Sequence, residues 1–180
     1  MFDTKEIKQA FETFGKEVIQ EARSNLTRKD KNVSKELYNG LNYEFEGYKG
    51  GFRFVINMPE YGLYQDAGVK GAKESTKAPD SPYRFGSGTG KKGGLKKGID
   101  SWVRKRRIQF QNRENGRFLS YDSTAFLIRR SVFLTGIKKT EWFTRAFELK
   151  FKRLEPKIED AMTISIEKLL DFTVKENFKK

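Results

Sequence analysis

The chain has 180 residues and contains neither cysteine nor histidine, which excludes disulfides, zinc–thiolate sites and histidine as a general base or metal ligand. Catalysis would have to rest on Asp, Glu, Lys, Tyr, Ser or Thr, which favours a protein that is not an enzyme, and we expect no metal or cofactor. The net charge is +13, and Val69–Arg107 alone carries twelve cations against three anions. A positive field concentrated in one segment attracts phosphates or an acidic protein surface.

The first predicted element is a helix from about Thr4 to Asn25 or Arg28. Apolar residues recur in it at spacings of three and four, which places them in one stripe. Gly15 interrupts the middle of this helix, and we interpret it as a position of close packing. The N-terminal segment is charged from Asp3 onward, which is not typical of a signal peptide, and no run approaches the roughly 20 apolar residues that span a bilayer. We expect a protein that is assembled in the cytoplasm and has no membrane partner.

A β-hairpin is predicted next. Apolar and polar residues alternate over 41–46 and again over 52–58, with a Lys-Gly-Gly turn between the two runs. The apolar members are mostly aromatic and share one face. Because two strands alone are marginally stable, we expect a helix or further strands to cover that face. Residues 59–68 then predict one short helical turn that ends at Gly68.

The middle of the chain loses its periodicity. Residues 69–94 are rich in Gly, Ser, Thr and Lys and contain two of the four prolines, so we predict a long basic loop. A helix over Leu95–Phe110 follows. Asn115-Gly116, in the polar segment after that helix, indicates a turn.

Two helices are predicted in the C-terminal third. An apolar helix that carries Arg129 and Arg130 should end at Gly136, a residue that suits the left-handed position just past a helix end. After a four-residue turn, Thr140 is predicted to be the N-cap of a second helix that opens with Glu141. We expect the aromatic residues at the start of this helix to pack it against the sheet.

Pro156 either kinks this second helix or starts another, and the apolar stripe continues beyond it, so we expect a helical extension over 156–180. Together the elements predict an α+β fold in which an antiparallel sheet is packed by an N-terminal helix and by C-terminal helices. We expect one domain over residues 1–180, with 69–94 as an extended basic loop inside it.

Two short motifs do not support an enzyme. Gly86–Lys92 resembles a phosphate-binding loop, yet three residues separate its glycines where a P-loop has four, and no strand precedes it. Asp80 could begin a metal-nuclease carboxylate set, yet the matching Glu148-Leu-Lys150 lies far along the chain on a predicted helix. We interpret 86–92 as part of a flexible basic loop, and metal-dependent cleavage is a remote alternative.

Cations and aromatic residues form the candidate contact surfaces. The run Arg104–Arg107 could bind a nucleic-acid backbone, or it could be a solvated face that meets an acidic partner, and both interpretations stay open. Aromatic side chains could stack on bases, but we favour packing and interface roles for them. The candidate contacts to a partner or to DNA are Lys91, Lys92, Lys96, Lys97, Arg104, Lys105, Arg106 and Arg107. The candidate packing or interface anchors are Tyr61, Tyr64, Trp142, Phe143 and Phe147.

Two segments together resemble a known family. They are Tyr61–Gly68, which reads YGLYQDAG, and Ala125–Phe147, with its core GIKKTEWF. Both are similar to segments of the neck or tail-completion proteins of tailed bacteriophages, the head–tail connector group, in the versions of crAss-like and other Bacteroidetes phages. The family's plan of an N-terminal helix, an antiparallel sheet, a tyrosine-containing segment before a variable loop, and a C-terminal helix fits residues 1–68 and 120–150. The basic insertion and the C-terminal helical tail are longer here than in small members.

The resemblance implies a structural virion protein at the head–tail junction or in the tail, which forms a homo-oligomeric ring of six or twelve copies. Such a ring would link portal or connector proteins to tail proteins around the DNA channel, with a possible non-specific contact to packaged DNA. We expect the loop 69–94 to become ordered only on assembly. The alternative, from a different class, is a sequence-nonspecific nucleic-acid-binding protein that uses residues 69–107.

Overall fold

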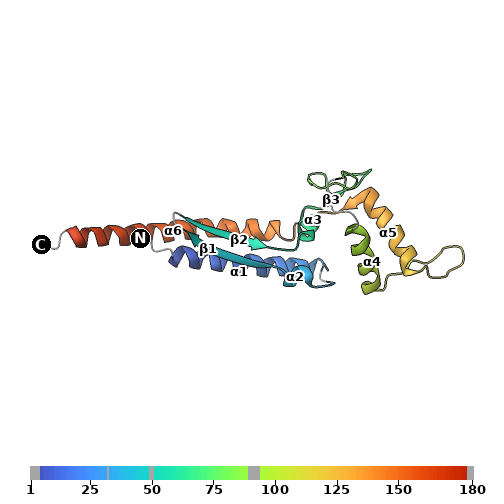
Figure 1. The fold of residues 1–180 in the computed structure, drawn as a ribbon, viewed down its shortest axis with the longest axis horizontal. Helices are drawn as coiled ribbons and strands as arrows, with labels where there is room; N and C mark the ends of the chain where they lie inside the picture. The colour runs from blue at the N-terminus through green and yellow to red at the C-terminus, as the bar shows by residue number, and fades with distance from the viewer. Residues whose placement is uncertain (1–4, 32, 49–50, 89–93, 178–180) are drawn as a thin grey trace. The chain divides into compact units, whose positions relative to one another are not determined.

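The structure, a computed structural model, describes residues 5–31, 33–48, 51–88 and 94–177, with side chains described as far as residue 163. These residues form helices and short antiparallel strands, which confirms the predicted α+β class (Figure 1). The elements are α1 (Lys5–Arg28), α2 (Glu36–Asn39), β1 (Asn42–Tyr48), β2 (Gly51–Asn57), α3 (Tyr61–Ala67), β3 (Val69–Lys70), α4 (Gly94–Arg106), α5 (Tyr121–Thr135), β4 (Gly136–Ile137) and α6 (Thr144–Asn177).

Contacts divide the chain into two compact units. Met1–Arg28, Tyr38–Met58 and Trp142–Lys180 make up the first, which we call the helix–hairpin unit. Lys29–Leu37 and Pro59–Glu141 make up the second, which we call the basic unit. The expectation of one domain over the whole chain stays a prediction.

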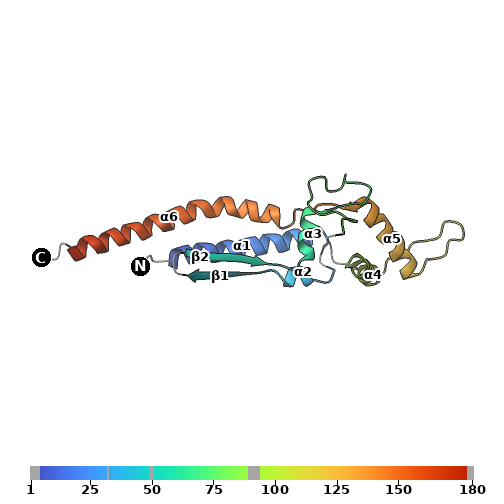
Figure 2. The same cartoon turned by 45° about the horizontal axis from the view of Figure 1, so that its top comes forward.

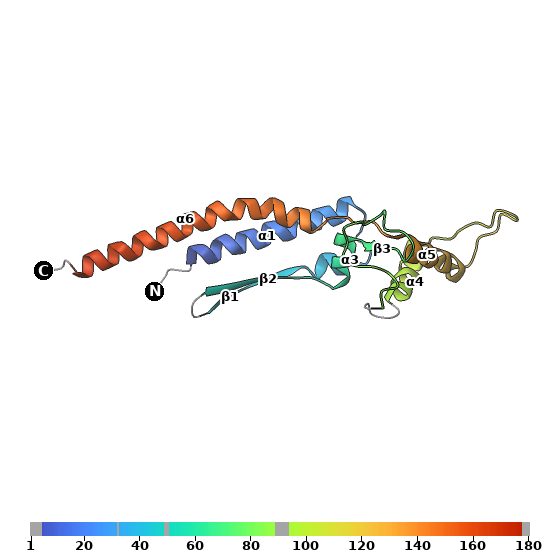
Figure 3. The same ribbon diagram turned by 90° about the horizontal axis from the view of Figure 1, so that it is seen from above.

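The helix–hairpin unit has three layers. Figure 2 and Figure 3 show α1 between the β1–β2 hairpin and α6. β1 and β2 pair antiparallel along their whole length, and the ring of Phe11 on α1 lies within 5.7 Å of the rings of Phe45, Phe52 and Phe54. The predicted hairpin, its aromatic face and its helical cover are therefore confirmed.

α1 buries the stripe that its spacing predicts. Phe14 and Val18 are 5% and 0% exposed, and they form the core of this unit with Leu154 of α6. A Cβ on Gly15 would lie 2.7 Å from the ring of Tyr43. The close packing predicted at this glycine is confirmed, because any larger residue would push the hairpin away from the helix.

The start of α6 differs from the sequence prediction. Thr140 is not the N-cap, because its hydroxyl donates to the carbonyl of Gln65 at 2.6 Å, and α6 begins only at Thr144. Glu141 has a φ of 49° and lies outside the helix that it was predicted to open. α6 then continues through Pro156 as one helix, so the proline starts no second helix. The predicted helical extension is confirmed as far as residue 177, while its apolar stripe beyond 163 lies outside the described side chains.

The predicted aromatic anchors of α6 pack against a different partner than expected. Trp142 is fully buried, and its carbonyl accepts a hydrogen bond from Asn25 Nδ2 at 2.9 Å. The ring of Phe147 meets the edge of Phe14 at 5.5 Å, and Phe143 joins the same cluster. These residues hold α6 against α1 rather than directly against the sheet, because α1 lies between the two.

Residues 71–88 of the predicted basic loop form no helix or strand, but they are bonded to other segments of the chain. They follow β3, which pairs with β4. They then fold onto the end of α5, where the N–H of Ala72 donates to the carbonyl of Phe133 at 2.8 Å, and Ala78 is 1% exposed. Main-chain bonds to a distant segment thus order these residues within the chain, without any periodicity in their sequence. Residues 89–93 lie outside the described part.

α4 and α5 of the basic unit are joined by an ion pair between Arg129 and Asp100, with a shortest distance of 2.8 Å. α4 ends before the predicted Phe110, at Arg106, because the next residue, Arg107, adopts a left-handed φ of 53°. The N–H of Ile108 then bonds back to the carbonyl of Val103 at 3.0 Å, which closes the helix.

α5 begins at Tyr121, ahead of the apolar run. The hydroxyl of Ser120 caps it by accepting a hydrogen bond from the N–H of Ser123 at 3.1 Å. The helix ends, as predicted, before Gly136, whose φ is 84°. The predicted turn at Asn115-Gly116 is also confirmed, with a φ of 67° at the glycine.

Candidate interaction surface

Three glycines join two distant segments of the basic unit. We call Gly68, Gly71 and Gly136 the glycine junction. Gly68 and Gly136 have φ values of 73° and 84°, a conformation that strains other residues. A Cβ on Gly136 would fall on the carbonyl oxygen of Val69, and one on Gly71 would fall on the carbonyl of Leu134. β3 and β4 can approach each other only because no side chain stands between them.

The chain that follows β4 is bonded to the end of α3. The hydroxyl of Thr140 donates to the carbonyl of Gln65, and the N–H groups of Thr140 and Glu141 both donate to the carbonyl of Asp66 at 3.0 Å. The junction and these bonds therefore make one structural block from two segments that lie far apart in the sequence.

Tyr61 and Tyr64, two of the predicted anchors, pack within the basic unit. The ring of Tyr64 lies edge-on to Tyr83 at 4.7 Å, and its hydroxyl donates to Glu60 at 3.2 Å. Tyr61 is partly buried, and burial, followed by the nearby carboxylate of Glu36, raises the pKa of its hydroxyl. The ring of Tyr64 thus packs on Tyr83, and both tyrosines are half-buried.

The predicted cationic contacts divide into paired and unpaired side chains. Arg104 pairs with Asp122 at 2.6 Å, and Arg106 pairs with Asp30 at 2.7 Å, where its hydrogen bond lowers the pKa of the Asp30 carboxyl. Both pairs are exposed and add little stability. The predicted cations that are exposed and form no ion pair within the described residues are Lys96, Lys97, Lys105 and Arg107. Lys91 and Lys92 lie outside the described residues.

The excess positive charge belongs to one unit. By sequence, the basic unit holds 21 Lys and Arg residues against 10 Asp and Glu residues, a net charge of +11. The helix–hairpin unit holds 16 against 14, a net charge of +2. The excess positive charge therefore lies in the basic unit, even though three of its arginines are paired to carboxylates.

The sequence analysis missed a set of exposed apolar side chains in the basic unit. Phe126 on α5 is 54% exposed, and Phe118 in the preceding loop is 67% exposed. The available signal was α5 itself, which carries apolar residues on more sides than one buried stripe needs. The members of the set are Leu63, Trp102, Phe110, Phe118, Phe126, Leu127 and Phe133.

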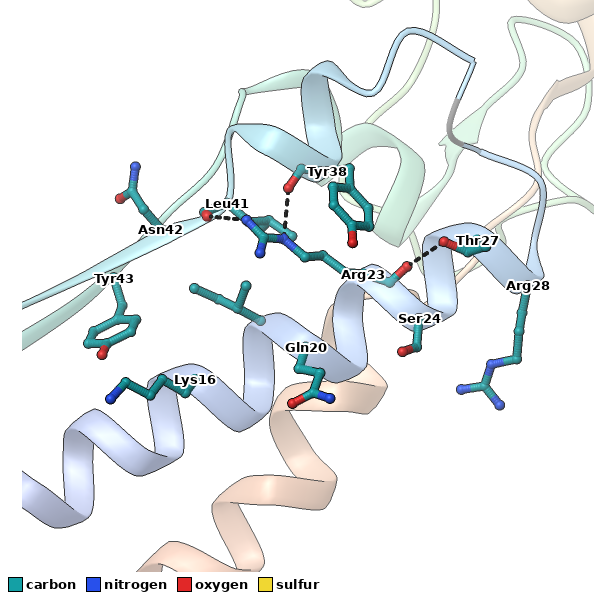
Figure 4. Close-up of a pocket in the computed structure, with 11 residues that line it drawn as sticks. Lys16, Gln20, Arg23, Ser24, Thr27, Arg28, Tyr38, Leu41, Asn42 and Tyr43 are labelled. Carbon is teal, nitrogen blue, oxygen red and sulfur yellow. Dashed lines mark hydrogen bonds between the residues drawn. The ribbon is translucent and has the colours of Figure 1, made fainter.

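An open groove of about 880 Å³ lies in the helix–hairpin unit, between α1 and the chain that leads into β1 (Figure 4). Arg23 crosses the groove, with Nε donating to the carbonyl of Tyr38 at 2.9 Å and Nη2 donating to the carbonyl of Leu41 at 3.3 Å. The guanidinium also lies 4.9 Å from the centre of the Tyr38 ring. Arg23 thus fastens the chain ahead of β1 to α1, while Lys16 and Arg28 line the rim.

Within the part of the chain that the structure describes, no three His, Cys, Asp or Glu side chains gather as a metal site requires. None of the described helices is long and apolar enough to cross a membrane. Comparison of the chain with known protein families, with curated proteins and with solved structures finds no match.

Proposed function

We propose that this chain is a structural virion protein that forms a ring at the head–tail interface of a tailed bacteriophage and links portal-side to tail-side proteins around the DNA channel. One observation carries the proposal. The two segments on which the resemblance rests, Tyr61–Gly68 and Ala125–Phe147, are bonded to each other through Thr140 and the carbonyls of Gln65 and Asp66. Two short motifs are better evidence of a shared architecture when the fold holds them together than when each stands alone.

The surface of the basic unit supports assembly with other chains. It exposes several large apolar side chains and several cations that form no ion pair with another described residue. Aromatic residues are the usual anchors of protein interfaces, and exposed charge selects the partner and the orientation. A subunit that joins unlike neighbours needs such contact surfaces rather than a cleft for chemistry.

The proposal is tested by co-expressing the chain with the portal and tail proteins encoded beside it, and by examining the product with mass photometry and electron microscopy. We expect closed rings of six or twelve copies attached to one of those proteins. Infectious virions that lack this polypeptide, or turnover of a substrate by the isolated chain, would contradict the proposal.

A second candidate, sequence-nonspecific nucleic-acid binding, is favoured by the net charge of +11 on the basic unit. It predicts micromolar binding of the isolated chain to any duplex, with a logarithmic salt slope of about 0.9 per contacted phosphate. The ring proposal predicts little binding by the free chain. Fluorescence anisotropy with two unrelated duplexes at several salt concentrations separates the two candidates.

A further inference from the structure

Both outer edges of the β1–β2 hairpin are open. Each strand has seven residues, and among the described residues no main-chain hydrogen bond joins either outer edge to another segment. α1 covers one face of the hairpin and leaves its edges uncovered (Figure 3). An open edge presents a row of unpaired N–H and C=O groups that can pair with another strand.

The hairpin lacks several of the devices by which proteins usually protect such edges, although its strands carry Glu44, Glu46 and Arg53. Neither 42–48 nor 51–57 contains proline or lysine. The pairing register is continuous from Asn42 opposite Asn57 to Tyr48 opposite Gly51, so no bulge bends an edge away. Seven residues is also longer than the short strands that usually stand unprotected at a sheet edge.

The charges of the two strands identify the occupant. On the face away from α1, β1 carries Glu44 and Glu46, whereas β2 carries Arg53. A β1 edge therefore suits the β2 edge of another copy better than it suits a second β1 edge, since like charges on neighbouring strands are destabilising. The net charge of this unit is only +2, so two such units can approach without the repulsion expected between two basic units.

We propose that the outer edge of β1 in one copy pairs antiparallel with the outer edge of β2 in the next copy, so that the hairpins of neighbouring copies form one continuous sheet. Because the two edges differ, the contact is head-to-tail, and such contacts either close into a ring or continue as a filament. The pairing itself follows from the open edges and their charges, while its closure into a ring rests on the proposed function.

Disulfide trapping tests the pairing directly, because the chain has no native cysteine. Glu46→Cys and Arg53→Cys are made as separate variants with tags of different size, mixed at high concentration and oxidised. Each chain then has one thiol, so every disulfide joins two copies. We expect 46–53 links to predominate over 46–46 and 53–53 links. The control is Ser131→Cys, an exposed position on α5, which should link to neither variant.

Absence of links, or equal amounts of the three kinds, would overturn the pairing. Charge reversal gives a second measurement that does not depend on oxidation. Arg53→Glu should cause loss of the oligomer in light scattering, and adding Glu46→Lys to the same chain should restore it, with thermal unfolding showing that both variants fold. A double variant that stays monomeric while folded would contradict the inference.

The outcomes for the inference and for the proposed function can be told apart. Rings that form without 46–53 links would overturn the edge pairing and leave the ring proposal in place. Links in an open filament would support the edge pairing and contradict closure into a ring. If, in the co-expressed assembly, the thiol at position 46 links to a portal or tail protein instead of to a second copy, a different chain occupies the edge and the inference is wrong.

Discussion

At Gly136 the backbone has a φ of 84° and lies against the carbonyl of Val69, so this position requires both a left-handed backbone and the absence of a side chain. Gly88 has a similar φ of 78°, but a Cβ there would meet no atom within 4 Å. The two glycines therefore separate the effect of backbone strain from the effect of a blocked contact.

We expect Gly136→Ala to lower the free energy of unfolding by more than about 2 kcal/mol. Alanine would be strained in the left-handed backbone conformation, and its methyl group would also push β3 away from β4. Gly88→Ala should cost only about 1 kcal/mol, from strain alone. Urea unfolding followed by circular dichroism measures both losses. Equal losses would show that the glycine junction is not closely packed in solution.

The hydroxyl of Tyr61 gives a prediction for alkaline pH. Burial raises its pKa above the ordinary value of 10.0, so the folded chain holds this proton more tightly than the unfolded chain. The resulting stability is fully present below the unfolded pKa and is lost as the pH rises through the folded pKa. In an absorbance titration, the Tyr61→Phe variant should lack one of the tyrosines that lose their proton above the ordinary pKa of 10.0. The free energy of unfolding of this variant should also fall less steeply than that of the original chain above pH 10.0. Parallel curves for the two proteins would contradict the prediction.

Among the elements, α4 shows how a helix can end without glycine. Arg107 occupies the left-handed position, and the N–H of Ile108 bonds back to the carbonyl of Val103. Glycine is the residue that usually stands at this position. The helix end is therefore held by its hydrogen bonds and by the packing of α4 on α5, at the cost of strain at one residue.

Arg107→Gly should relieve that strain and raise the unfolding free energy by up to about 1 kcal/mol. Lys105→Gly removes the same charge two residues earlier, inside the helix, and should lower the free energy by about 1 kcal/mol. Thermal or urea unfolding of the two variants compares them directly. A loss of stability in Arg107→Gly would mean that α4 extends further in solution, as the sequence pattern predicted.

At the scale of the whole molecule, the two units differ strongly in net charge. The helix–hairpin unit, which holds the aromatic core, has a net charge of +2, whereas the basic unit carries +11. Charge concentrated in one unit can attract an anionic partner to that unit.

Binding of the chain to an anionic matrix such as heparin should therefore depend on where charge is removed. One variant changes Lys96, Lys97, Lys105 and Arg107 to Glu. Its control changes Arg145, Lys152, Arg153 and Lys157, exposed cations of α6, to Glu. Both alter the net charge equally, but we expect the first to elute at much lower salt than the second. Equal elution would show that only total charge matters.

The order of residue types over a few positions correctly predicted the elements that are formed by residues close together in the sequence. The spacing of α1, the alternation of the hairpin and the glycine after α5 each act within a few residues, and each prediction is confirmed. Local pattern failed where backbone groups find distant partners. The hydroxyl of Thr140 bonds a carbonyl 75 residues away, so the predicted N-cap did not form, and local pattern gave no sign that the loop after β3 is held by the end of α5.

Sequence alone determined the α+β class, the aromatic face of the hairpin and the concentration of cations in the middle of the chain, because each follows from residue type and near spacing. Only the tertiary structure decided that α1 separates α6 from the hairpin. It also decided that, among the described residues, Arg104 and Arg106 form ion pairs while Lys105 and Arg107 form none, and that no other described segment bonds to the hairpin edges. Each of these depends on which distant residues meet, and spacing along one chain does not specify that.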